Sequence, residues 1–207
     1  MIEVSHLVKK YGSHYAVNDL SFRVEKGQIY GFLGPNGAGK STTMNIITGY
    51  LAPTAGEVKI NGHDMMKEPE EAKRCIGYLP EMPPVYPDMT VGEYLRFAAQ
   101  LKRIPSGKRE ESIEEVMKMT RILDMKDRLI RNLSKGYKQR VGLSQALLGS
   151  PEVIILDEPT AALDPITEHG IYTRLDSIAG DKATIFISHR LSTCRFCDEI
   201  IVMDQGR

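Results

Sequence analysis

The sequence predicts an α/β protein built on a mainly parallel β-sheet, with an N-terminal antiparallel β subdomain and a helical insert. Three observations support this. Apolar runs that read as buried strands alternate with helical segments in the second half of the chain, the first 30 residues alternate as strands do, and residues 90–132 follow helical spacing. Buried strands that alternate with helices indicate a parallel sheet covered on both faces.

The elements of the first third follow from periodicity and turn residues. Strand-like alternation at the N-terminus is punctuated by turns at Gly12 and Gly27. Residues 28–34 are an apolar strand that runs into a glycine-rich turn, and the segment from residue 40 then reads as a helix that ends near Gly49. Residues 56–62 predict a further strand and turn.

The helical insert begins with a recognisable start signal. Thr90 and Glu93 form a capping box, in which each side chain bonds to the other's backbone N–H. Apolar residues follow at helical spacing, first Val91, Tyr94, Leu95, Ala98 and Leu101, and then, in a second helix, Ile113, Val116, Thr120 and Leu123. We expect a single domain over 1–207 with a helical subdomain inserted at 82–134.

The rest of the chain alternates helix and strand. In order, we expect a helix at 135–148, a strand at 152–158, a helix at 166–178, a strand at 183–188, a helix through Cys194 and Cys197, and a strand at 199–204. The two cysteines read either as half of a zinc or redox site or as two small apolar residues one helical turn apart. The second interpretation is favoured because the sequence offers no further ligands to complete four.

Composition limits the classes of partner. Lys plus Arg and Asp plus Glu both number 27, so the net charge is zero, and we expect no nucleic-acid partner because such proteins need a clustered positive field. The longest apolar runs, 153–156 and 200–203, are far shorter than the roughly 20 residues that cross a bilayer. The N-terminus lacks a signal-peptide core, so we expect a cytoplasmic protein.

Residues 34–42, GPNGAGKST, carry the strongest motif. They follow a strand, open a helix and match the phosphate-loop pattern G-x-x-x-x-G-K-[ST]. Glycines let backbone N–H groups turn inward around phosphate oxygens, and the helix N-terminus adds partial positive charge. Lys40 supplies a cation for the β and γ phosphates, Ser41 a hydroxyl ligand for magnesium, and Thr42 reaches the α phosphate. The pattern predicts a P-loop NTPase core whose nucleotide-binding residues are Gly34, Pro35, Asn36, Gly37, Ala38, Gly39, Lys40, Ser41 and Thr42.

A pair of acidic residues narrows the reaction. Asp157 and Glu158 end a buried apolar strand. Asp157 is expected to face magnesium, directly or through water. Glu158, one residue further on, is expected beyond the γ phosphate, where a carboxylate can orient an attacking water or accept its proton. The alternative, a charged pair that merely ends a strand, is weakened by the phosphate loop in the same chain.

Six motifs in this order resemble the ATP-binding cassette (ABC) family, over essentially the whole sequence. The first three are Tyr11 in KKYG, where the family stacks an aromatic ring on adenine, the phosphate loop, and GYLPE (77–81) at the Q-loop. The fourth is LSKGY (133–137) at the signature motif, and the fifth is ILDEPTAALDP (155–165), which contains the magnesium and base strand and the D-loop. The sixth is SHR (188–190), which supplies the switch histidine, His189.

The resemblance implies a set of roles. ATP is the substrate and Mg²⁺ the cofactor, held by Ser41, Glu81 and Asp157. The catalytic residues are Lys40, Glu158 as general base and His189 as sensor of the γ phosphate. His189 reads alternatively as a core histidine, and Tyr11 as a residue that packs at a strand end. Ser134 and Gly136 of the signature motif bind the ATP of a second protomer, so a homodimer with two shared sites is implied.

Four residues depart from the family pattern: Lys135 and Tyr137 stand for the Gly and Gln of LSGGQ, Glu81 stands for the Q-loop Gln, and Ala161 stands for a D-loop Ser. Ser134 and Gly136, the phosphate-contacting positions, are kept, so ATP binding is expected to persist. A carboxylate at Glu81 still ligates magnesium but adds negative charge beside a triphosphate. The departures therefore concern rate and coupling more than nucleotide binding.

The function implied is the ATPase subunit of an ABC transporter, exporter-like, which dimerises on ATP and drives a separate membrane permease from the inner face of the cell membrane. The alternative is a soluble, non-transport ABC ATPase that acts on nucleic acid or ribosomes. Such proteins carry a long coiled coil, zinc modules or two fused cassettes, and none of these is evident here. A regulatory protein that holds ATP without hydrolysing it is disfavoured because Lys40, Glu158 and His189 are all present.

Overall fold

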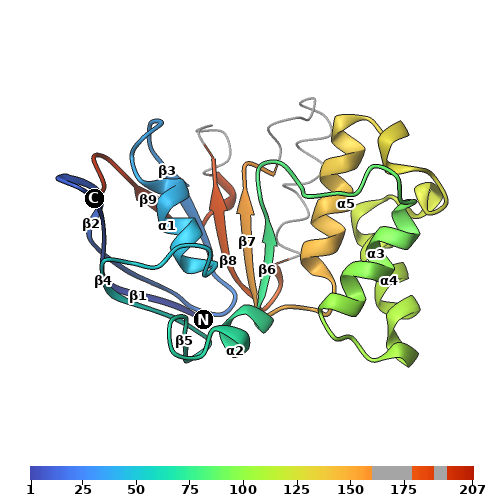
Figure 1. Cartoon of the computed structure of the whole chain (residues 1–207), viewed down its shortest axis with the longest axis horizontal. Helices are drawn as coiled ribbons and strands as arrows, with labels where there is room; N and C mark the ends of the chain where they lie inside the picture. The colour runs from blue at the N-terminus through green and yellow to red at the C-terminus, as the bar shows by residue number, and fades with distance from the viewer. Residues whose placement is uncertain (160–178, 189–194) are drawn as a thin grey trace. The chain divides into compact units, whose positions relative to one another are not determined.

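The computed structural model (Figure 1) describes residues 1–159, 179–188 and 195–207. These residues form two compact units. The first unit contains Met1–Ile76, Glu152–Ile155 and the described residues from 179 onward. The second contains Gly77–Pro151 and residues 156–159. The predicted helix at 166–178 and most of the predicted helix through the two cysteines lie outside the described residues. The boundaries 1–207 and 82–134 stay predictions.

The N-terminal antiparallel sheet is confirmed. It consists of β1 (Ile2–Tyr11), β2 (His14–Val24), β4 (Ala55–Ile60) and β5 (His63–Asp64), in the order β2-β1-β4-β5. On β1, Ile2 lies opposite Val24 of β2 and Ile60 of β4, and all three side chains are buried. The predicted alternation thus places one apolar face of this sheet in the core.

The second sheet has five strands in the order β6-β7-β8-β3-β9: β3 (Ile29–Leu33), β6 (Ile76–Leu79), β7 (Val153–Asp157), β8 (Ala183–Ile187) and β9 (Glu199–Val202). Strand β3 pairs in parallel with both β8 and β9. Strands β7 and β8, which lie next to each other in this order, are buried almost throughout, which explains their continuous apolar sequences. The predicted mainly parallel sheet is confirmed.

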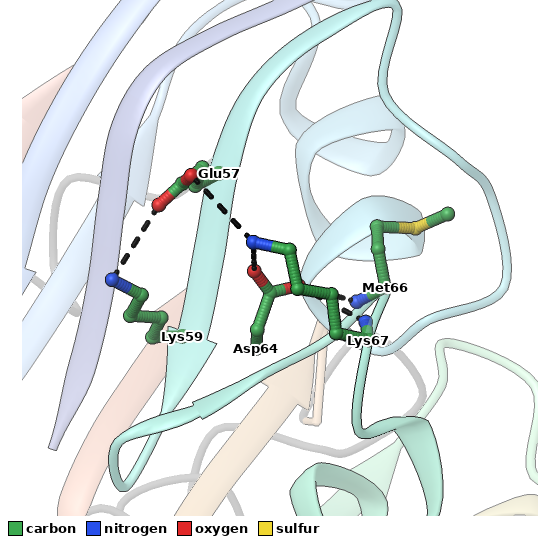
Figure 2. A network of polar contacts seen from close by, with 5 residues as sticks. All are labelled: Glu57, Lys59, Asp64, Met66 and Lys67. Atoms are coloured by element: carbon green, nitrogen blue, oxygen red, sulfur yellow. Dashed lines mark hydrogen bonds and ion pairs between the residues drawn. The ribbon is translucent and has the colours of Figure 1, made fainter.

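A polar corner fixes the chain after β5, where it turns into the short helix α2 (Pro69–Arg74). Figure 2 shows the carboxylate of Asp64 accepting hydrogen bonds from the backbone N–H groups of Met66 (2.9 Å) and Lys67 (3.1 Å). The same carboxylate pairs with the Lys67 ammonium at 3.0 Å, and Lys67 also faces Glu57 on β4. These bonds hold the corner against the antiparallel sheet within the first unit.

The second unit is mainly helical. Helices α3 (Val91–Leu101), α4 (Ser106–Thr120) and α5 (Lys135–Leu147) pack side by side (Figure 1), and two short 3₁₀ turns, η1 (Leu123–Met125) and η2 (Ile130–Asn132), lie between α4 and α5. The predicted capping box is present, with Thr90 accepting from the Glu93 N–H and Glu93 accepting from the Thr90 N–H. Within the described residues, no helix is both long enough and apolar enough to span a membrane.

One detail of the helical insert was predicted wrongly. Leu123 does not continue α4, because the helix ends at Thr120 and Arg121 adopts a left-handed conformation at φ 56°. The N–H of Ile122 then bonds to the carbonyl of Met117, which completes a C-terminal cap of the Schellman type. Leu101 lies on α3 as predicted but is largely exposed.

Candidate functional site

The loop between β3 and α1 (Lys40–Ile47) has the geometry of a phosphate cradle. Gly34 and Gly39 have φ angles of 148° and 99°. A Cβ atom on Gly34 would lie 2.3 Å from the carbonyl oxygen of Met203, and one on Gly39 would lie 2.3 Å from that of Ala16. Both positions therefore require glycine for two reasons, the backbone angle and the close approach of other main chain.

Lys40 is the first residue of α1 and is buried, with 8% of its surface exposed. Its ammonium group donates hydrogen bonds to the carbonyl oxygens of Gly34 and Pro35, the latter at 3.0 Å. The loop thus curls around its own cation. A phosphate that enters the loop meets a charge that is already held in place, which reduces the ordering cost of binding.

Among the described residues, no side chain caps the first backbone N–H groups of α1. Its N-cap is Gly39, which makes no side-chain capping bond, and its first turn contains no acidic residue. The first N–H groups of a helix without such a cap are available to an anion, and the helix dipole favours negative charge there. Ser41, in this turn, is exposed, and Thr42 is half-buried. The geometry suits the phosphate groups of a nucleotide.

Tyr11 belongs to the same unit and ends β1. About half of its surface, 51%, is exposed, and the ammonium group of Lys9 lies 5.3 Å from its ring centroid. An exposed aromatic ring is compatible with adenine stacking and is less consistent with a ring that packs at the end of a strand.

In the second unit, the predicted signature motif opens α5. Ser134 is the N-cap, and its Oγ accepts a hydrogen bond from the N–H of Tyr137 at 3.3 Å. Ser134 is exposed and Gly136 is half-buried. Because the cap uses Ser134 as an acceptor, its hydroxyl proton is still available to donate. The predicted helix start is therefore confirmed, and its chemistry suits an anion.

The two unusual residues of the signature motif lie differently. Lys135, the first residue of α5, is exposed. Tyr137 is half-buried, and the guanidinium of Arg140 lies 5.3 Å from its ring centroid. This cation–π contact on one side of the helix fixes the ring that replaces the usual glutamine.

The acidic pair lies at the end of β7. Asp157 is its last residue, and both Asp157 and Glu158 are half-buried. Glu158 has a φ angle of 48°, a left-handed conformation that is rare outside glycine and is often found at functional positions. On β6, burial and then the charge of Asp157 raise the pKa of Tyr78 to about 12, so this phenol stays neutral beside the carboxylate.

Glu81 follows β6 and is exposed. Its backbone carbonyl accepts a hydrogen bond from the side-chain amide of Gln139 on α5, at 3.5 Å. Sequence reasoning missed Gln139 as a residue of interest. The available signal was its spacing, because Gly136, Gln139 and Gly142 recur every three residues and so lie close together along one side of a helix.

The predicted site residues fall into two groups. The phosphate loop and Tyr11 belong to the first unit, whereas Glu81, Ser134, Gly136, Asp157 and Glu158 belong to the second. His189 and Ala161 lie outside the described residues, and their predicted roles stay predictions. No group of three or more His, Cys, Asp or Glu side chains suited to a metal is found in the described part of the chain.

Comparison with known proteins identifies the family. A family model described as ABC transporter matches residues 17–161, more than half of the chain. The chain belongs to the ABC transporter family. The resemblance drawn from the six motifs is thereby confirmed.

Two curated ABC transporter relatives match the whole chain. YxlF of Bacillus subtilis (strain 168), an uncharacterised ABC transporter ATP-binding protein, is 37% identical, and the chain spans 68% of its length. BcrA of Bacillus licheniformis, a bacitracin transport ATP-binding protein, is 38% identical, and the chain again spans 68% of it. The chain thus corresponds to about two thirds of these relatives.

Solved structures of ABC proteins agree. The structure of an ATP-binding subunit of an ABC transporter is 32% identical with a TM-score of 0.91, over 100% of this chain and 87% of that one. A dimeric post-hydrolysis state of the cassette MJ0796, bound to ADP and Pi, is 27% identical with a TM-score of 0.87, over 100% and 95% of the two chains. The chain is therefore an ATP-binding and ATP-hydrolysing ABC cassette, and the non-transport alternative is not favoured.

Proposed function

We propose that this ABC cassette binds Mg²⁺·ATP at residues 34–42, hydrolyses it with Glu158, and drives a separate membrane permease on whose inner face it docks. The observation that carries the proposal is the start of α1, where the N-cap Gly39 makes no side-chain capping bond and the carbonyls of Gly34 and Pro35 hold the buried Lys40 ammonium. Negative phosphate oxygens complement both features.

The residues available suit magnesium. Ser41 supplies a hydroxyl, and Asp157 and Glu81 supply carboxylates, all hard oxygen donors. Magnesium is usually held by one or two protein ligands together with substrate phosphates and water, so a cluster of three acidic side chains is not required. When bound, the ion neutralises charge that develops on the β and γ phosphates.

Glu158 is assigned as the general base. Its carboxylate follows the strand that carries Asp157, and its left-handed backbone turns the chain directly after that residue. A carboxylate there orients a water molecule and accepts its proton, whereas the phosphate loop holds the triphosphate.

The test is the Glu158→Gln substitution. We expect hydrolysis to fall by about two orders of magnitude or more while ATP binding persists, because the amide cannot accept the proton. Glu152→Gln is the matched control, since Glu152 precedes the same strand, is exposed and pairs with Lys26 and Asn61. Turnover by Glu158→Gln close to that of the parent would disprove the role of Glu158.

We propose further that two protomers share their sites, with Ser134 of each serving the ATP of the other. The dimeric MJ0796 cassette bound to ADP and Pi supports this arrangement. Two inactive variants test it, Lys40→Ala and Ser134→Arg. In a mixed dimer, one composite site has an intact phosphate loop and an intact signature helix, and the other site is doubly impaired.

Mixing the two variants is expected to restore part of the ATPase activity, because random pairing makes about half of the dimers mixed. Two differently tagged Ser134→Arg chains are the control, since that pair contains no intact site and must remain inactive. Absence of recovery in mixtures shown to contain mixed dimers would contradict a shared site that turns over alone.

A further inference from the structure

The segment after β6, residues 81–87, is bound along the helices of the second unit by its backbone carbonyls. The carbonyl of Glu81 accepts from the Gln139 amide, that of Pro84 from the Tyr94 hydroxyl at 3.5 Å, and that of Pro87 from the N–H of Arg131 at 3.0 Å. The segment contains three of the chain's prolines, so it has few N–H donors and depends on donors from other elements.

Helix α5 approaches this segment closely at Gly142. A Cβ atom at Gly142 would lie 2.6 Å from Cβ of Pro83 and 2.8 Å from Cδ1 of Leu79, distances that real Cβ contacts do not reach. Gly142 is buried and has no φ angle that demands glycine. Glycine is needed at position 142 because a larger side chain would collide with Pro83 and Leu79. The segment 81–87 is therefore in van der Waals contact with α5 at this position.

Gln139 lies one turn before Gly142 on the same helix, and only 3% of its surface is exposed. Burying an amide is costly unless it forms hydrogen bonds, and its Nε2 group is directed at the Glu81 carbonyl. Gly136 of the signature motif lies a further three residues back. One helix thus carries, in successive turns, the phosphate-facing glycine, the amide that binds Glu81 and the glycine that contacts Pro83.

We propose that Gln139 is a positioning residue that fixes Glu81, through its backbone carbonyl, to the signature helix α5. A displacement of α5 then carries Glu81 with it, so that the helix start and the carboxylate move together. The inference rests on the proposed function in one respect, that Glu81 is a ligand of the nucleotide-bound magnesium. The attachment of the segment to α5 does not depend on that assignment.

Gln139→Met tests the attachment, because methionine has a similar length and favours helix but has no N–H donor. The chain contains no tryptophan, so Met82→Trp provides a single fluorescent reporter beside Glu81. Met82 is 80% exposed, which leaves room for the indole. We expect lower fluorescence anisotropy and faster acrylamide quenching of the reporter when Gln139→Met is added, in the absence of nucleotide and metal.

The matched control is Ser144→Ala on the same helix. Ser144 is buried and hydrogen-bonded to Thr120 and to the Arg140 carbonyl, and within the described part of the chain it forms no hydrogen bond to the segment 81–87. Its loss lowers stability without removing the Glu81 contact, so the reporter signal should match that of the parent. Should Gln139→Met fail to fold, Gln139→Glu gives the same readout, because a carboxylate repels the carbonyl.

A second readout follows metal binding rather than turnover. Mn²⁺ binding, measured by electron paramagnetic resonance with a non-hydrolysable ATP analogue, is expected to weaken about 2- to 10-fold in Gln139→Met and not in Ser144→Ala, the range that corresponds to one hydrogen bond. The positioning role would be overturned if Gln139→Met left the anisotropy and quenching of the Met82→Trp reporter unchanged. It would also be overturned if Gln139→Met made the reporter more mobile but left the Mn²⁺ affinity unchanged. If the parent itself binds no nucleotide, the proposed function fails, and the reporter still decides whether Gln139 holds the segment.

Discussion

Lys102 and Leu148 are joined by a hydrogen bond of 2.9 Å, from the ammonium group at the end of α3 to the carbonyl that follows α5. A second bond of the same length reaches the carbonyl of Ala146. The lysine thus caps the C-terminus of α5, whose last carbonyls lack partners within the helix. Burial of the amine lowers the pKa of Lys102 to about 8.

Lys102→Met should reduce the free energy of unfolding at pH 7 by about 1–3 kcal/mol, because two carbonyls lose their donor. The pKa of Lys102 is about 8 in the folded state and 10.5 as its ordinary value, so between these pH values the unfolded chain binds more protons. The parent therefore gains stability as pH rises through this window, and Lys102→Met does not. Urea unfolding of both proteins from pH 7 to 10.5 measures the difference. If the difference in unfolding free energy between the parent and Lys102→Met did not change with pH, the amine of Lys102 would not be desolvated in the folded state.

Asp64→Asn should destabilise the first unit at neutral pH by about 1 kcal/mol, because the charged acceptor of the corner in Figure 2 is lost. The hydrogen bond with the Lys67 side chain, and then the Met66 N–H, lower the pKa of Asp64 below its ordinary 3.8. The carboxylate therefore stabilises the fold fully above pH 3.8, and this contribution disappears as pH falls through the folded-state pKa.

The measurement for Asp64 is urea unfolding of parent and Asp64→Asn from pH 3 to 7. The difference between them should narrow only at the acidic end. Lys67→Met is the control, since it removes the exposed ammonium and leaves both backbone bonds. A gap between parent and Asp64→Asn that persists undiminished at pH 3 would show that the charge of Asp64 is not responsible.

Gly39→Ala should abolish tight ATP binding and lower stability by about 2 kcal/mol or more, because a methyl group there meets the Ala16 carbonyl at 2.3 Å. Gly37→Ala is the matched control in the same loop. Gly37 also has a positive φ, 85°, but open space surrounds its Cβ position, so its loss costs about 1–2 kcal/mol of backbone strain only. Fluorescent nucleotide titration and thermal unfolding distinguish the two. Equal effects would show that backbone angle alone governs both positions.

Thr184→Val should leave stability unchanged or raise it by up to about 1 kcal/mol, in contrast to most core substitutions. Thr184 lies on β8 beside β3, is 1% exposed, and within the described part of the chain its Oγ1 has no hydrogen-bond partner. Valine keeps the shape and removes the cost of burying the hydroxyl. Thermal unfolding of the two proteins is the measurement, and a clear loss of stability would mean that the hydroxyl is hydrogen-bonded in solution.

Much of the fold could be predicted because its signals are local. The phosphate loop, the capping box of Thr90 and Glu93 and the cap at Ser134 each depend on residues within a few positions of one another. The buried strands β3, β7 and β8 were recognisable because a strand covered on both faces must be apolar throughout. The end of α4 could not be predicted in this way, because the left-handed residue that ends the helix is Arg121, whereas the usual signal is glycine.

The sequence by itself determined the family, the phosphate-loop motif and the buried strands β3, β7 and β8, since these follow from short-range patterns and from the backbone freedom of glycine. Only the tertiary structure decided that Gln139 binds the Glu81 carbonyl, that Gly142 admits Pro83, and that Lys102 caps α5. These pairs are separated by 58, 59 and 46 positions in the chain. Such contacts depend on how helices pack in space, and spacing in the sequence can place Gln139 and Gly142 on one side of a helix without showing which residues they contact.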